Sequence, residues 1–341
     1  MSNTARPIRV SRHLVVRETV GARPHRSRGF RLDVESLDGT TVVHHYGHGG
    51  GGFSLSWGTG EMAVGLLDAL DATPARTPVA VLGAGSVGLA TARLLQERGH
   101  EVEILSADPI DATTSAVAGA SWYPVGVFAG APTTEARGAM FEDAARRSHA
   151  RFADLADEDV GVRWGDEYVP DNSPERIEAG HGWVFRRLRD LYPGGELLKG
   201  DDHPFATRYA LRYRTLFMDA PIYLRAMLDR FLEADGRFTT RRLDSIAQVR
   251  ALPQSIVFNC TGTGARALFG DHTLTPVLGR LFHLDPQIGV NYGVQIDDFR
   301  YVVPRSSALL LGTSWEPEGT DIVQEGRDAE SVIPEIARVT G

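Results

Sequence analysis

The sequence predicts an α/β protein with two parts, a Rossmann-type unit and a second part built on an antiparallel sheet. Residues 79–106 predict the first part, because a short apolar run, a glycine-rich turn, a helical stretch and a second apolar run follow one another there. From residue 273 onward, a series of strand-like segments predicts the second part. With 341 residues, the chain is long enough to form two substantial cores.

Three glycines, Gly83, Gly85 and Gly88, carry the functional signal of the first part. A strand, glycine turn, helix and strand in this order place a dinucleotide pyrophosphate at the N-terminus of the helix. The glycines let the backbone approach the phosphates, and the helix dipole favours their charge. This spacing alone is a weak signal, but the two flanking strands and the helix make it a prediction of a dinucleotide site. The 78 residues that precede the motif are unusual.

Composition excludes several classes of partner. The net charge of −8 and the isoelectric point near 5.8 argue against a nucleic-acid or anionic-membrane partner. Cys260 is the only cysteine, so no internal disulfide can form and we expect a reducing, cytoplasmic location. Residues 1–20 hold no signal-peptide pattern, and no apolar run is long enough to span a membrane. We expect no metal site, because no cysteine or suitably spaced carboxylate joins the histidines of residues 44–48.

Two features precede the dinucleotide motif. Arg23 stands before Pro24, whose ring stiffens the backbone, so its guanidinium is suited to bidentate pairing with a carboxylate. Judged locally, a solvated loop arginine is the commoner alternative. Residues 41–46 read as a strand, and the glycine-rich run 47–52 and an amphipathic helix over 59–70 follow it. Such a run allows close approach to a ligand such as a flavin, whereas residues 71–78 read as a linker.

Several later segments leave alternatives open. Asp108, two residues beyond the end of the second strand, is a candidate for the ribose. The small, polar segment 113–124 is either backbone packed on a cofactor or a simple loop. Tyr209 and Tyr213 share one face of a predicted strand, where they line a pocket or pack within a sheet. Residues 255–262 read as a strand that runs into a small-residue turn, as happens where a parallel strand meets a ligand.

Taken together, seven segments resemble the FAD-dependent D-amino-acid oxidase family, which includes D-aspartate oxidases. They are VAVLGAGSVGLATA, AGASWYP, YRTLFMDAPIYL, VFNCTGTGA, YVVPR with LLLGTSW, VGARPHR and HHYGHGGGGFSLSWG. In the family, the last two segments lie at the C-terminus, whereas here they come first. We therefore interpret the chain as a circular permutant, in which joining Gly341 to the N-terminus would restore the usual order.

The resemblance implies a division into an FAD-binding domain and a substrate domain. The substrate domain would comprise residues 1–40, 126–236 and 271–341, and the FAD-binding domain residues 41–125 (with the linker at 71–78) and 237–270. One departure from the family stands at LGR, residues 278–280, where an RGQ-like run is usual.

The resemblance also implies roles for individual residues. Arg23 and Tyr213 would contact the substrate carboxylate, the carbonyl of Gly50 would receive the substrate amine, and Tyr209 aligns loosely with a lid tyrosine. The implied FAD-contacting residues are Gly49, Gly52, Phe53, Ser54, Gly83, Gly85, Ser86, Val87, Gly88, Asp108, Thr113, Thr114, Gly119, Ser121, Leu243, Thr261 and Gly262.

The implied reaction needs little acid–base machinery. A D-amino acid would lose a hydride from Cα to flavin N5, and O2 would then reoxidise the flavin to give hydrogen peroxide. The imino acid would hydrolyse to a keto acid and ammonia. Two alternatives remain: a same-fold enzyme for another amine, such as a secondary amine or a biosynthetic intermediate, and a flavin-binding protein without turnover. A neutral side chain is favoured for the substrate, and a homodimer stays open.

Overall fold

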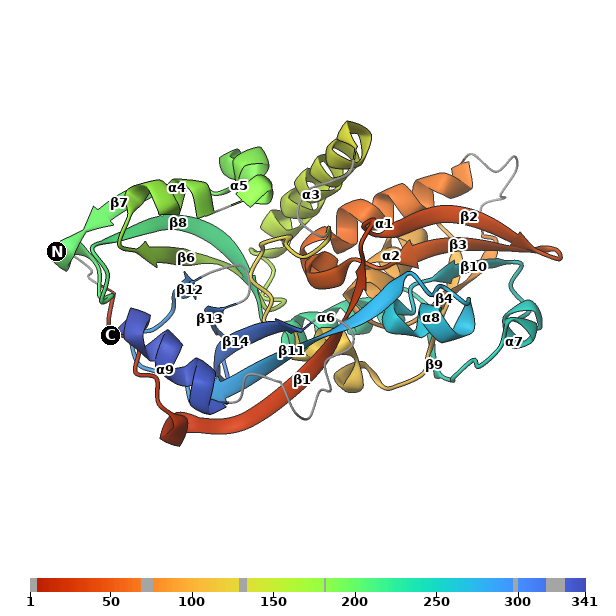
Figure 1. Ribbon diagram of the computed structural model, residues 1–341. Helices are drawn as coiled ribbons and strands as arrows, with labels where there is room; N and C mark the ends of the chain where they lie inside the picture. Colours follow the sequence, from red (N-terminus) through yellow and green to blue (C-terminus); the bar gives the residue numbers. More distant parts are fainter. Residues whose placement is uncertain (1–4, 69–75, 129–133, 181, 297–299, 317–328) are drawn as a thin grey trace.

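The computed structural model describes residues 5–68, 76–128, 134–180, 182–296, 300–316 and 329–341. These residues form two sheets that lie side by side, with helices packed around them (Figure 1). One sheet is mainly parallel and the other mainly antiparallel. The α/β fold class predicted from the sequence is therefore confirmed.

The six-stranded sheet contains the predicted Rossmann-type unit. Its strands are, in spatial order, β2 (Arg31–Leu37), β3 (Thr40–Tyr46), β10 (Ile256–Asn259), β4 (Pro78–Leu82), β5 (Glu101–Ser106) and β9 (Arg237–Thr240). All neighbours are parallel except the β2–β3 hairpin. The strands β4 and β10 are almost fully buried, which matches their mainly apolar sequences, whereas β5 also carries Glu101 and Glu103.

The eight-stranded sheet forms the second part. Its strands are, in spatial order, β1 (Val15–Arg26), β11 (Leu274–Leu284), β14 (Leu309–Glu316), β13 (Tyr301–Pro304), β12 (Gly293–Gln295), β6 (Val162–Asp171), β8 (Tyr209–Met218) and β7 (Glu196–Lys199). Only the β12–β6 pair is parallel. The N-terminal strand β1 thus pairs along its whole length with β11, more than 200 residues later in the chain.

Two helices from the first part of the chain cover the six-stranded sheet, and two later helices pack on them. The helix α1 (Gly52–Asp68) contacts α2 (Ser86–Glu97) and α3 (Glu135–Leu155). A Cβ on Gly58 would lie 1.9 Å from the carbonyl oxygen of Ala144, so only glycine lets α1 and α3 approach this closely. The helix α6 (Ala220–Glu233) packs on α2.

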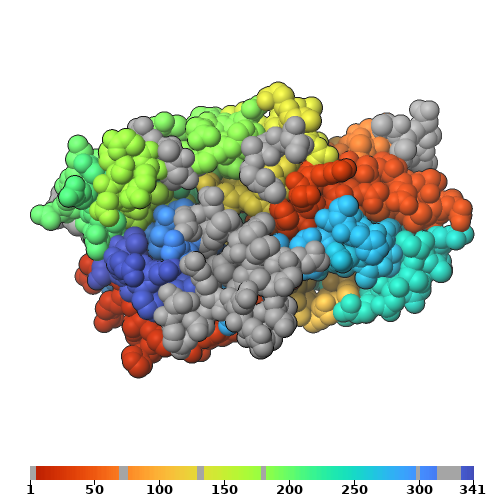
Figure 2. Space-filling model, in the orientation of Figure 1, coloured from red at the N-terminus to blue at the C-terminus, as the bar shows by residue number. Residues whose placement is uncertain are grey.

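The remaining helices are short or lie at the C-terminus. They are α4 (Pro174–Gly180), α5 (Gly182–Leu188), α7 (Ile246–Arg250), α8 (Ala265–Leu268) and α9 (Ala329–Thr340). The buried residues Val332, Ile333 and Ile336 of α9 share a core cluster with Ile8 from the other end of the chain. Figure 2 shows this blue C-terminal segment between red N-terminal and green residues. None of the helices in the described ranges is long and apolar enough to cross a membrane.

Three element boundaries differ from the sequence-based expectations. Residues 31–37 form β2 in the six-stranded sheet, so the division between the two sheets falls before residue 31 and not at residue 40. The helix α1 begins at Gly52, because the glycine-rich run turns directly into a helix. The stretch IRVSRHLVV, residues 8–16, has a strand-like sequence, but the strand β1 begins only at Val15, after a 3₁₀ turn. Most of the expected linker at 71–78 lies outside the described residues.

Candidate functional site

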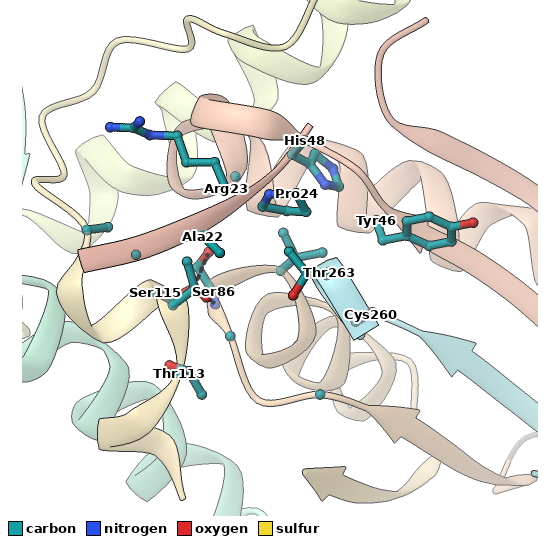
Figure 3. Close-up of a pocket in the computed structure, with 18 of the residues that line it drawn as sticks. Ala22, Arg23, Pro24, Tyr46, His48, Ser86, Thr113, Ser115, Cys260 and Thr263 are labelled. Carbon is teal, nitrogen blue, oxygen red and sulfur yellow. Dashed lines mark hydrogen bonds between the residues drawn. The ribbon is translucent and has the colours of Figure 1, made fainter. Parts of the chain in front are cut away.

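A cavity of about 510 Å³ lies where the two sheets meet. The carboxyl ends of β4, β5 and β10 border it on one side, which is where ligands bind in open α/β sheets. The strands β1 and β11 and the first turn of α1 border it on the other side. The volume falls in the range of small-molecule and cofactor sites. Figure 3 shows the residues around it.

The cavity gathers most of the residues implied to hold FAD from five separate parts of the sequence. Its lining includes Gly49, Gly52, Phe53, Ser54, Gly83, Gly85, Ser86, Val87, Asp108, Thr113, Thr114, Gly119, Ser121, Leu243, Thr261 and Gly262. Gly88 does not line it. A Cβ there would lie 2.0 Å from the carbonyl oxygen of Gly83, so Gly88 allows α2 to pack against the glycine turn.

The turn between β4 and α2 has the geometry of a phosphate-binding loop. Gly83 has a φ of +101°, and a Cβ there would lie 2.6 Å from the carbonyl oxygen of Cys260. The helix α2 begins at Ser86, whose backbone N–H donates to Ser115 Oγ at 3.0 Å. The first backbone N–H groups of α2 therefore face the cavity together with a small hydroxyl cluster, a suitable environment for a pyrophosphate.

A second helix begins at the same cavity. Gly49 has a φ of +55°, and a Cβ there would lie 1.9 Å from the carbonyl oxygen of Gly126. The neighbouring N–H of Gly50 donates to that oxygen at 3.3 Å. These contacts bring the backbone of the glycine-rich run and the first turn of α1 against the cavity, where the positive end of the helix dipole would suit the electron-rich edge of a flavin.

Asp108 lies at the exposed rim of the cavity. Its side chain is 54% exposed and forms an ion pair with Arg242 at 3.4 Å. The hydroxyl of Ser106, at the end of β5, donates to the carbonyl oxygen of Asp108 at 2.7 Å and fixes this turn. Asp108 is therefore placed where it can accept hydrogen bonds from a ribose, beside Leu243.

Arg23 reaches the cavity from β1, and Gly50 borders the same space. Arg23 pairs with Val277 across the sheet, and its Nη1 donates to the carbonyl oxygen of Leu278 at 3.5 Å. In Figure 3 its guanidinium lies apart from the Ser86–Ser115 contact, which the dashed lines mark. Arg23 therefore projects from a part of β1 that is paired with β11, and not from a loop.

The structure does not bring Tyr213 or Tyr209 to the cavity. Tyr213 is 1% exposed and donates from its hydroxyl to Glu167 Oε2 at 3.1 Å, while its ring contacts Tyr192. Tyr209 lies four residues further from the cavity on the same strand and does not line it. The alternation of apolar and arginine residues along β8 indicates which residues share a face, but not how far that face lies from the cavity.

Other side chains line the cavity without having been assigned to the site from the sequence, among them Tyr123, Leu281, Gln295 and Tyr301. Tyr301 and Gln295 are direct partners on β13 and β12. Tyr301 belongs to the YVVPR segment and Tyr123 to AGASWYP, so the signal for both was present in the quoted segments. Their approach to the cavity depends on strand order, which the sequence does not show.

Burial keeps three other cavity-lining side chains neutral. It lowers the pKa of His48 to about 3, lowers that of His45 well below its ordinary value, and raises that of the Cys260 thiol to about 12. Cys260 is buried, as expected of a packing residue. In the part of the chain that the structure describes, no three histidine, cysteine, aspartate or glutamate side chains are grouped to hold a metal.

Fold and cavity together define an α/β protein with a candidate dinucleotide site at the carboxyl edge of its mainly parallel sheet. Residues 78–339, more than half of the chain, match the DAO family, described as FAD dependent oxidoreductase. The chain therefore belongs to the DAO family of FAD dependent oxidoreductases, and its cofactor is FAD. When bound, FAD would be held by the glycine turn after β4, by Asp108 and by the glycine-rich run before α1.

Individual relatives agree with this family. The chain is 29% identical over 272 residues to a D-amino-acid oxidase of Streptomyces coelicolor, covering 76% of this chain and 78% of that protein. It is 30% identical over 280 residues to a D-aspartate oxidase of Talaromyces thermophilus, covering 72% of each. The fold is similar to that of glycine oxidase from Geobacillus kaustophilus, with a TM-score of 0.58, 17% identity and coverage of 76% and 77%.

Glu167 behind the cavity gives a testable pH dependence. Burial raises its pKa from the ordinary 4.5 to about 7, although the hydrogen bond from Tyr213 opposes this. The folded chain therefore holds this proton more tightly than the unfolded chain. As the pH rises from about 4.5 to about 7, loss of this proton should lower the free energy of unfolding by up to about 3 kcal/mol, with no further loss above that range.

The variant Glu167→Gln should remove this decline. Urea unfolding of the FAD-loaded protein across this pH range would measure it, with Glu101→Gln on the exposed end of β5 as the control. A decline that is as steep in Glu167→Gln as in the parent protein would contradict the assignment.

Proposed function

We propose that the chain is an FAD-dependent oxidase of D-amino acids. The observation that carries the proposal is the position of Arg23, which borders the same cavity as the glycine turn of the cofactor site. A carboxylate-binding arginine beside a flavin site suits a substrate with an α-carboxylate. The names of the relatives, D-amino-acid oxidase and D-aspartate oxidase, support this substrate class.

The residues of the chain would act mainly by orientation. Arg23 would bind the carboxylate with two parallel N–H···O bonds, and the carbonyl of Gly50 would accept a hydrogen bond from the neutral amine. These two contacts fix the direction of the Cα–H bond. Tyr123, Leu281 and Tyr301 would exclude water from the reacting carbon. When bound, FAD supplies the two-electron acceptor and O2 would reoxidise it, so the products would be an imino acid, which hydrolyses, and hydrogen peroxide formed from O2.

The charged residues that line the cavity indicate which kind of substrate side chain the site would accept. The other charged residues among the described lining, Asp108, Arg241, Arg242 and Asp244, lie at the β5 and β9 side. On the side of the eight-stranded sheet, the described lining holds no charged side chain besides Arg23 and includes the amide of Gln295 and the ring of Tyr301. This supports a D-amino acid with a neutral side chain. Because the fold is similar to that of a glycine oxidase, a small amino acid or another amine with a carboxylate is the alternative substrate.

We also propose the circular permutation as the reason that these segments form one site. Three features support it. The strand β3 is an internal, parallel strand of the six-stranded sheet, although it precedes the glycine turn in the chain. The family match begins at residue 78, at the start of β4. A Cβ on Gly341 would lie 3.6 Å from Pro7, so the two ends of the described chain are adjacent.

A reordered chain would test the permutation. It would begin at residue 76, run to Gly341 and continue through a short linker into residues 5–68. We expect it to bind FAD and melt like the parent, because the ends it joins are adjacent and the contacts it keeps are the same. A chain lacking residues 1–75 should fail to bind FAD, because it loses β3 and α1. Failure of the reordered chain to bind FAD, together with FAD binding by the chain that lacks residues 1–75, would contradict the permutation.

The substrate role of Arg23 can be tested by Arg23→Ala. Losing a bidentate, charge-assisted contact should raise KM for the best D-amino acid by about 100-fold or more. FAD absorbance and the oxidation of a primary amine without a carboxylate should change little. Arg280→Ala is the matched control, because Arg280 lies on β11 beside the site but pairs with Glu18 at 3.2 Å. An unchanged KM in Arg23→Ala would contradict the role.

A further inference from the structure

Two glycines on neighbouring strands of the eight-stranded sheet lie against side chains from adjacent strands, and one of them, Gly279, lines the cavity. Gly279 lies on β11 and Gly312 on the neighbouring strand β14. Neither has the left-handed backbone conformation that would by itself require glycine. Both positions are instead crowded by a side chain from an adjacent strand. The space above each glycine is therefore used by a neighbouring residue.

The side chain above Gly279 is Arg23. A Cβ on Gly279 would lie 2.4 Å from Arg23 Nη2 and 2.5 Å from Cζ and Nη1. Arg23 belongs to β1, the strand next to β11, so its guanidinium leans across β11 instead of pointing straight away from the sheet. All three crowded atoms are at the flexible end of a long side chain. An alanine at position 279 would therefore push the guanidinium aside without moving the backbone.

The side chain above Gly312 is that of Tyr301. It comes from the strand on the other side of the β11–β14 pair from Arg23. A Cβ on Gly312 would lie 2.1 Å from Tyr301 Cζ, and a Cβ on Gly119 would lie 2.6 Å from the Tyr301 hydroxyl. Tyr301 belongs to β13, the next strand after β14, and leans back across β14. The ring is thus held between two glycines, one in the sheet and one in the loop above it.

The two leaning side chains converge. Gly312 pairs with Leu281, which stands two residues from Gly279 along β11. With about 4.8 Å between strands and about 6.7 Å for two residues along a strand, the two glycines lie roughly 8 Å apart. A carboxylate that accepts hydrogen bonds from both a guanidinium and a phenol needs a gap of this order. Leu281 lies between them and lines the cavity.

We propose that Gly279 is a positioning residue for the substrate carboxylate, because its missing side chain lets Arg23 lie across β11 toward Tyr301. Gly312 does the same for Tyr301 from the other side. Neither glycine touches the substrate, and each acts through the side chain above it. The inference rests on the proposed function, in which Arg23 binds the carboxylate.

The test uses the FAD-loaded full chain and the variant Gly279→Ala. Benzoate, a carboxylate without an amine, serves as the probe, and its dissociation constant is read from the change in flavin absorbance. Gly279→Ala should weaken benzoate binding by about 10- to 100-fold and raise KM for amino acids to a similar degree, with kcat much less affected. FAD affinity and Tm should match those of the control Gly195→Ala, where a Cβ meets nothing within 4 Å.

A double variant separates positioning from a general structural effect. If Gly279 acts only through Arg23, Gly279→Ala should have no further effect on benzoate binding in an Arg23→Ala background. Equal losses in both backgrounds would overturn the proposal. If Gly279→Ala alone fails to fold, recovery of folding in the double variant would support a clash with Arg23. Continued failure to fold would place the clash in the backbone and overturn it.

The benzoate measurement also separates this inference from the proposed function. A parent protein that oxidises no amino acid would contradict the proposed oxidase activity. In that case, loss of benzoate binding in Gly279→Ala would still support the positioning of Arg23. A parent that oxidises D-amino acids while Gly279→Ala binds benzoate as tightly as the parent would overturn only the inference.

Discussion

The structure depends on backbone approaching backbone at distances that leave no room for a Cβ atom. Gly83 and Gly49 each place a missing Cβ within 2.6 Å of a carbonyl oxygen from another segment, and Gly88 places one 2.0 Å from the carbonyl oxygen of Gly83, in the turn before its own helix. These contacts bring the ends of three strands and the starts of two helices around one cavity. A helix N-terminus can stabilise a phosphate or a reduced flavin only at short range, so the electrostatics of the site follow from this packing.

Much of the fold and of the cavity could be predicted from the sequence, because the signals are local. The period of the apolar residues and the glycine spacing together specify the β4–α2–β5 unit. Arg23 and Gly50 could be placed at the site only through the resemblance, since an arginine before a proline is locally unremarkable. The resemblance also implied that residues 41–70 belong to the FAD-binding part and residues 1–40 to the substrate part. In the structure β3 lies in the six-stranded sheet and α1 packs on it, but β2 also lies there.

The parts that could not be predicted depend on the pairing of distant strands. Tyr213 shares a face with Leu211, as the alternation indicates, but β8 lies near the far edge of the eight-stranded sheet and places Tyr213 on buried Glu167. Tyr301 reaches the cavity because β13 pairs with β14 and the ring crosses Gly312. The role of Gly279 likewise requires the register of β1 on β11. A single sequence carries no information on these registers.

The proposed oxidase site for D-amino acids is assembled from segments at both ends of the chain. Anaerobic mixing of the FAD-loaded protein with matched panels of D- and L-amino acids, followed by flavin absorbance, tests it most directly. We expect loss of the oxidised flavin band with D-isomers and not with their L-enantiomers. Equal bleaching by both enantiomers, or none with either panel, would contradict it.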